Sequence, residues 1–148
     1  MLRLICVSLA LVIAGCASRA YVVPVDGPRA TIKYRLVSPG PEASVFTHID
    51  SKCAERKWMG GMKGTPRPND KLQTEFSTTI AASRPFHTTV FLDVSNTSYC
   101  GVNWEFVPTD GASYEADVSY ADEKCDVKFY QIDGGSRVLM ESPPATCK

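Results

Sequence analysis

Cysteine carries the most identifiable chemistry in this chain of 148 residues, which contains six of them. Cys16 directly follows a short apolar stretch, residues 4–14, which begins after the positively charged Arg3. Helical residues in that number would span only about 16 Å, whereas a bilayer core needs about 20 apolar residues. A basic start, a short apolar run and then small residues are typical of a secretory signal. We therefore expect residues 1–15 to be a signal peptide.

The sequence LVIAGC at residues 11–16 resembles the lipobox of bacterial lipoproteins, in which aliphatic and small residues precede a cysteine. The resemblance implies that a diacylglycerol is attached to the sulfur of Cys16. It also implies that signal peptidase II cleaves after Gly15 and that the new amino group is acylated, for example with palmitate. Two or three acyl chains anchor a protein stably where a single chain would not. The alternative is cleavage by the ordinary signal peptidase, with Cys16 incidental.

The residues after Cys16 help to predict in which membrane the protein is anchored. Ala17 and Ser18 follow the cysteine, whereas inner-membrane lipoproteins of enteric bacteria carry an aspartate directly after it. The resemblance therefore implies lipid anchoring in the outer membrane with the domain facing the periplasm. Exposure at the cell surface remains the alternative.

Four cysteines remain in the body of the chain: Cys53, Cys100, Cys125 and Cys147. An even number in an oxidising compartment predicts two disulfides. No pair has the short spacing of a zinc ligand pair or the Cys-x-x-Cys spacing of a redox site. Three connectivities are possible. We expect Cys53–Cys100, which would tie the early strands to the centre, and Cys125–Cys147, which would close a hairpin.

Composition indicates one domain of ordinary charge. Without residues 1–15 the chain keeps 133 residues, with 15 basic and 16 acidic side chains. That length suits a single domain with a hydrophobic core, and a net charge near zero gives no sign of nucleic-acid binding. We divide the chain into a signal at 1–15, a lipid anchor and extended tether at 16–28, and a domain at 29–148.

The domain alternates between apolar and polar residues over many short segments. Strict alternation predicts half-buried strands, and the turns that separate them contain Pro, Gly, Asn and Asp. The expected strands lie at 29–36, 44–49, 71–80, 86–94, 100–106, 113–120, near 125–129 and at 137–141. Residues 50–70 are the exception, with one or two helical turns expected at 51–58 and then a long irregular excursion. About seven or eight strands with little helix predict an all-β fold, an antiparallel β-sandwich with an immunoglobulin-like look.

The spacing Phe106-x-Pro108-x-x-Gly111-x-x-Tyr114, followed by Cys125, also resembles a pattern in small β-rich envelope lipoproteins of proteobacteria. The resemblance supports an envelope location and implies no activity.

Residues suited to catalysis or metal binding are few. The histidines are His48 and His87, and alternation places His87 opposite the apolar face of its strand, where we expect it to be exposed. A copper site combining the histidines with Met59 or Met62 lacks tight spacing. No Gly-x-Ser-x-Gly elbow is present. We expect no cofactor, no metal and no enzyme activity.

The acidic residues Asp122, Glu123 and Asp126 lack the spacing of a calcium loop. A pair of glycosidase carboxylates among them would need a groove that the sequence does not specify, so we interpret the cluster as a solvated turn.

The segment Trp58-Met59-Gly60-Gly61-Met62 is the most unusual short stretch. We expect it either to cover one end of the domain, which we favour, or to form a binding patch for a partner or sugar. Tyr99, at a strand entrance, is expected to be exposed and is the fourth candidate residue of such a patch. Trp104 lies between alternating apolar residues and is expected in the core.

These features favour a non-enzymatic, membrane-anchored envelope lipoprotein that binds an envelope protein or glycan or has a structural role. One alternative is a glycan-binding or hydrolytic module that uses Trp58, Tyr99 and an acidic pair in one groove. Another is a periplasmic inhibitor or chaperone-like protector that acts through the 50–70 segment.

Overall fold

A computed structural model describes residues 19–38, 41–50, 52–63, 73–95 and 98–141. Within these ranges the chain forms ten strands and no helix. The strands are β1 (Arg19–Ala20), β2 (Arg29–Leu36), β3 (Glu42–His48), β4 (Lys57–Lys63), β5 (Glu75–Ala81), β6 (Phe86–Ser95), β7 (Ser98–Phe106), β8 (Ser113–Ala121), β9 (Lys124–Asp133) and β10 (Ser136–Leu139). The all-β class predicted from alternation is confirmed.

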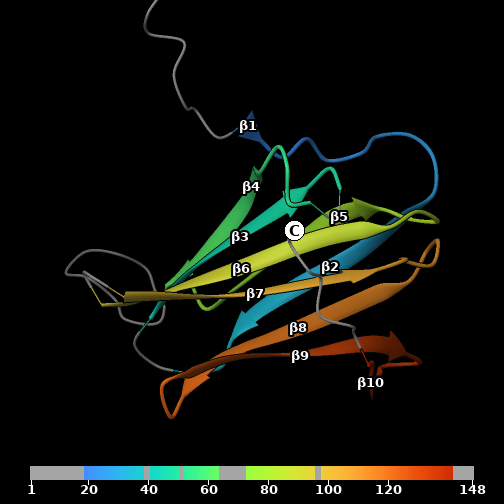
Figure 1. Cartoon of the computed structure of the whole chain (residues 1–148). Helices are drawn as coiled ribbons and strands as arrows, with labels where there is room; N and C mark the ends of the chain where they lie inside the picture. The colour runs from blue at the N-terminus through green and yellow to red at the C-terminus, as the bar shows by residue number, and fades with distance from the viewer. Residues whose placement is uncertain (1–18, 39–40, 51, 64–72, 96–97, 142–148) are drawn as a thin grey trace, which may run out of the picture.

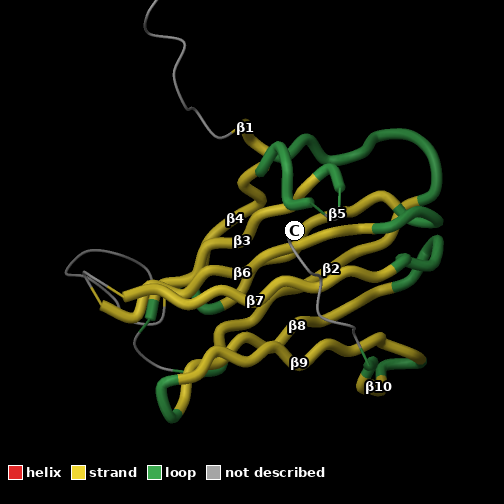
Figure 2. The backbone as a smooth tube through the Cα atoms, in the orientation of Figure 1, coloured by secondary structure: helices red, strands yellow, loops and turns green. Residues whose placement is uncertain are grey.

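The strands form two five-stranded sheets (Figure 1). The first has the order β1-β4-β3-β6-β7 and the second the order β10-β9-β8-β2-β5. Figure 2 shows that strands make up most of the described chain and that the loop after β1 arches over to β2. Neighbouring strands in each sheet are far apart in sequence in several places, so the chain passes between the sheets more than once.

Both sheets contribute to one hydrophobic core. The period-two pattern of β2 buries Ile32, Tyr34 and Leu36, as the alternation predicts. From the first sheet Trp104 enters the same core and lies with its ring centroid 6.3 Å from that of Tyr34. Fully burying one side chain of this kind contributes about 1.5–3 kcal/mol, so a change on either sheet affects the stability of both.

The sheets are not fully antiparallel, which corrects the predicted pairing. β2 pairs with β5 in the antiparallel sense but with β8 in the parallel sense, with Ile32 opposite Tyr114. The short β1 also pairs in parallel with β4. Alternation along one strand gives its buried face but not the direction of its neighbour, because both pairings place residues i and i+2 on one face.

Residues 57–63 form a strand, not part of an irregular excursion, and the helical turns expected at 51–58 are absent. β4 pairs with β3 along its length, and the ladder shifts register between Val45 and Phe46. Glycine at position 60 is required by a close contact, because a Cβ there would lie 2.7 Å from the ring of Phe76. Gly60, which forms part of a loop signal in sequence, therefore allows Phe76 of β5 to approach β4.

The disulfide between Cys100 and Cys125 joins β7 of the first sheet to β9 of the second, with a Cα–Cα distance of 6.2 Å. Both predicted pairings, Cys53–Cys100 and Cys125–Cys147, are therefore wrong. The bond forms because packing brings the edge of one sheet beside the other, a relationship that spacing in sequence does not encode. Cys53 is also disulfide-bonded, to neither Cys100 nor Cys125.

The segment expected to be an extended tether is partly attached to the domain. Arg19 and Ala20 pair with Lys57 and Trp58 on β4, and the backbone N–H of Tyr21 donates to the carbonyl of Trp58 at 2.8 Å. The chain therefore joins the first sheet three residues after Cys16. No helix in the described part of the chain has the length and apolar character needed to cross a bilayer.

Candidate functional site

The predicted patch residues do not form a single surface. Trp58, Met59 and Met62 lie on β4, whereas Tyr99 lies on β7, with β3 and β6 between these two strands. Adjacent strands lie about 4.8 Å apart, so at least 14 Å or so separates the two ends of the candidate patch. Tyr99 is exposed, as expected, and Trp104 is buried, as expected.

The three β4 residues line a groove of about 430 Å³ beside this strand. Trp58 is 46% exposed, Met59 is half-buried and Met62 is buried. The groove continues to Gln73, which lies before β5, and to Phe76 on β5 of the second sheet. The segment therefore neither covers an end of the domain nor projects as a loop: it is an edge with an exposed indole and a partly apolar groove.

The outer edge of β4 is only partly paired within the described residues. β1 pairs with it at Lys57 and Trp58, and Lys63 forms an isolated bridge with Gln73. Between these two points, residues 60–62 pair with β3 on the inner side, and Met59 lies at the register shift with no partner in the ladder. A strand edge of this kind presents backbone N–H and C=O groups that can pair with another extended chain.

His48 and His87 lie opposite each other on β3 and β6, and both are buried. The expectation that His87 is exposed is therefore wrong. Arg56, which precedes β4, lies over this face, with its guanidinium 5.0 Å from the ring centre of Phe91 on β6. Alternation assigned the face correctly but could not show the side chains of Arg56 and Glu105, which lie on it from other segments.

The two imidazoles belong to a polar cluster with a structural role. Nε2 of His48 lies 2.7 Å from Oγ1 of Thr89, and Thr89 donates to the side-chain oxygen of Asn103, so His48 is the donor to Thr89. Nδ1 of His87 lies 2.8 Å from a carboxylate oxygen of Glu105. No group of three or more His, Cys, Asp or Glu side chains suitable for a metal occurs in the described part of the chain.

Burial lowers the pKa of His48, and nearby Arg56 and His87 lower it further, while a backbone hydrogen bond with Cys53 and the charge of Asp50 act in the opposite direction. The neutral imidazole is therefore the favoured form. It holds the end of β3 against β6 through its bond to Thr89.

The acidic residues Asp122, Glu123 and Asp126 are exposed; the first two form the turn between β8 and β9, and Asp126 lies on β9. Asp122 and Glu123 both have positive φ angles, as a tight turn requires. They lie on the second sheet, whereas Trp58 lies on β4 of the first; the Cys100–Cys125 bond brings only the Tyr99 end of β7 near Asp126. None of the three pockets described on the structure is lined by these acidic residues together with Trp58 and Tyr99.

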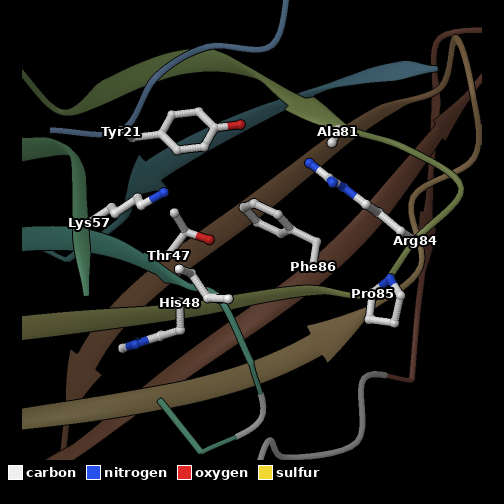
Figure 3. Close-up of a pocket in the computed structure, with 9 residues that line it drawn as sticks. Tyr21, Thr47, His48, Lys57, Ala81, Arg84, Pro85 and Phe86 are labelled. Atoms are coloured by element: carbon white, nitrogen blue, oxygen red, sulfur yellow. The ribbon is translucent and has the colours of Figure 1, made fainter. Parts of the chain in front are cut away.

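A second pocket, of about 300 Å³, lies where the segment after β1 meets the ends of β3 and β5. We call it the basic pocket; its lining includes Tyr21, Ile49, Lys57, Arg84, Pro85 and Phe86. Figure 3 shows that Lys57 and Arg84 direct their charged ends toward the space between Tyr21 and Phe86, while the imidazole of His48 points away. The residues come from the segment after β1, from the end of β3, from β4, and from the β5–β6 connection with the strand ends beside it.

The basic pocket has two cations and no acidic lining residue. In the described part of the chain neither Lys57 nor Arg84 forms an ion pair. By contrast, Arg35 and Arg137 are paired with Glu115 and Asp117 on the second sheet. The pocket therefore concentrates unneutralised positive charge beside apolar side chains.

Tyr21 forms one side of the basic pocket. Its hydroxyl donates to the carbonyl of Thr79 on β5 at 3.1 Å, which ties the segment after β1 to the second sheet. Burial raises the pKa of Tyr21, and Arg84 partly counteracts this effect. Sequence reasoning missed this pocket because its residues come from four separate segments and no local motif connects them.

The chain matches no protein-family model. A search of curated proteins also finds no matching relative. The features of the chain that indicate a function are the sequence motif at Cys16, the groove beside β4 and the basic pocket.

Proposed function

We propose that this protein is a lipid-anchored lipoprotein of the bacterial envelope with a non-enzymatic binding role. The observation that carries the proposal is the lipobox-like sequence ending at Cys16, together with the attachment of the chain to β4 from Arg19 onward. Three residues extend at most about 10 Å. A lipid on Cys16 would therefore hold the β4 edge close to the bilayer surface, not on a long tether. The proposed location is the outer membrane, with the domain facing the periplasm.

Metabolic labelling with a palmitate analogue tests the anchor. We expect the wild-type chain to incorporate label and to fractionate with the outer membrane, and Cys16→Ser to lose both properties. Cys6→Ser is the matched control, because this cysteine lies inside the proposed signal and should not affect labelling. Intact-mass analysis should give a mature chain that begins at residue 16 and carries acyl chains. An unmodified chain cleaved elsewhere would contradict the proposal.

The proposed binding surface is the groove beside β4, and the proposed partner is an envelope protein. In the described part of the chain, residues 60–62 of β4 pair only with β3, so an extended segment can add as a strand on the other side, with Trp58 as an exposed anchor beside it. Main-chain pairing of this kind recognises protein better than sugar. The placement of Trp58 and Tyr99 on separate strands weighs against the glycan-binding or hydrolytic alternative.

Site-specific photo-crosslinking in cells tests the partner. A photo-reactive residue at position 58 should capture a defined envelope protein, whereas the same residue at the exposed position 99 should capture nothing above background. Equal capture at both positions, or recovery of glycan fragments alone, would contradict a partner site at β4. The inhibitor or chaperone-like alternative would require residues outside the strand, within 64–70, which the structure does not describe.

We further propose that the two sheets pack as a β-sandwich with a second disulfide between Cys53 and Cys147. The shared core and the Tyr34–Trp104 contact across the sheets support the sandwich. The second disulfide follows by elimination, since Cys6 would leave with the signal and Cys16 would carry the lipid. Such a bond would fasten the loop over His48 to the C-terminal end of the chain.

A further inference from the structure

We infer that the basic pocket is a phosphate-binding site, and that its natural ligand is the phosphate of a neighbouring phospholipid headgroup. The choice of a lipid as the source rests on the proposed anchoring at Cys16. The phosphate chemistry itself does not, because it follows from the pocket. Nothing in the proposed partner site at β4 uses these residues.

The charge of the pocket favours an oxyanion. Lys57 and Arg84 approach from different segments, direct their charged ends toward one space and have no acidic neighbour in the lining. Two like charges in one pocket repel each other unless an anion lies between them. Arginine matches the geometry of phosphate oxygens through paired N–H donors, and lysine adds a point charge.

The apolar part of the lining favours a phosphate that carries an organic group. A volume of about 300 Å³ exceeds what a bare phosphate fills. Phe86 and Pro85 form an apolar wall opposite Tyr21, whose hydroxyl proton is already donated to Thr79. Tyr21 therefore shapes the pocket and offers no further proton to a ligand. A phosphodiester with a glycerol or acyl portion fits such a lining.

The position of the pocket favours a membrane source. Tyr21 is five residues after Cys16 and Lys57 is the β4 partner of Arg19. An extended segment of that length spans about 17 Å, so the pocket would lie at headgroup depth when Cys16 is lipidated. Near an anionic surface each Lys or Arg contributes about 1 kcal/mol to attraction, which corresponds to about a fivefold change in affinity.

Titration by nuclear magnetic resonance tests the site with the full chain carrying Cys16→Ser in maltoside micelles. One arm adds inorganic phosphate and the other adds dihexanoyl phosphatidylglycerol, a short-chain lipid with one phosphodiester. We expect saturable shifts of the amides of Lys57, Arg84 and Tyr21 in the lipid arm. Lys57→Gln and Arg84→Gln should each weaken binding about fivefold. Lys124→Gln, an exposed lysine at the β8–β9 turn, is the matched control and should change nothing.

Each outcome decides the inference. Saturable binding of the lipid and weaker binding of inorganic phosphate support the headgroup assignment. Equal affinity for both ligands retains the phosphate site but overturns the membrane source. No saturable shift with either ligand, or binding that both glutamine variants leave unchanged while their spectra remain folded, overturns the site. Because the tested chain lacks Cys16, failure of the proposed lipidation would not affect this result.

Discussion

The backbone N–H of Tyr21 donates to the carbonyl of Trp58 at 2.8 Å, and this bond fixes the start of the domain against β4. The bond lies between the groove and the basic pocket, because Trp58 lines the groove and Tyr21 lines the basic pocket. Any anchor at Cys16 would therefore orient both surfaces at once. A protein held in this way would present its β4 edge near the membrane and the opposite end of the molecule away from it.

The cysteine pairing gives the first prediction. Peptide mapping under non-reducing conditions should recover Cys100 linked to Cys125 and Cys53 linked to Cys147. Replacing both Cys100 and Cys125 with serine should lower the free energy of unfolding by about 3 kcal/mol, since the bond closes a long loop between two sheets. Urea titration measures the loss. A Cys53–Cys100 peptide would contradict the arrangement of β7 beside β9.

Gly60 gives the second prediction. Gly60→Ala should destabilise the domain by about 1–3 kcal/mol, because the new methyl group would meet the ring of Phe76. Phe76→Ala removes that ring, so the double variant should lose less stability than the sum of the two single variants. Additive losses in a double-mutant cycle would show that the contact between β4 and β5 does not limit this position.

Tyr34 gives the third prediction. Thr88 donates its hydroxyl proton to the carbonyl of Phe46, so the Tyr34 hydroxyl is the donor in its 3.1 Å bond to Thr88. Tyr34→Phe should therefore cost about 1 kcal/mol in the free energy of unfolding. Tyr120→Phe, outside the buried core, serves as a control and should have a smaller effect. A neutral result for Tyr34 would mean that Thr88 is satisfied without it.

The same residue predicts a loss of stability in alkali. Burial strongly raises the pKa of Tyr34 above its ordinary value, so the folded protein keeps the phenol neutral. The unfolded chain releases this proton near pH 10. The contribution of Tyr34 to stability is therefore complete below pH 10 or so and declines as the pH rises further. Unfolding free energies measured from pH 8 to 11 should show a steeper decline for the wild type than for Tyr34→Phe.

His48 predicts the opposite dependence in acid. Its pKa is lowered in the folded state, mainly by burial, so the unfolded chain binds the proton more readily. Stability from this residue is present above about pH 6.5 and declines as the pH falls through the lowered folded value. His48→Gln should flatten the stability profile between pH 7 and pH 5. An unchanged slope would indicate that the imidazole is not held neutral by its surroundings.

The sequence alone determined the local features of this protein. Apolar residues at every second position gave the buried faces of β2, β6, β7 and β8, since strand geometry turns period two directly into one face. Gly111, with a φ of 73°, occupies the turn that Pro108-Thr109-Asp110-Gly111 predicts. The lipobox-like run at Cys16 is also a local pattern, and the location proposed from it requires no tertiary contact.

Tertiary structure decided the features that depend on which segments meet. The parallel pairing of β2 with β8, the Cys100–Cys125 bond and the burial of His87 all require knowledge of distant neighbours. β4 escaped prediction because Gly60, which resembles a loop signal in sequence, serves a contact with Phe76 on the other sheet. The basic pocket combines Tyr21, Lys57 and Arg84 from three segments. Long-range packing decides which residues of distant segments come together. The spacing of residues in sequence shows only toward which face of its own strand each side chain points.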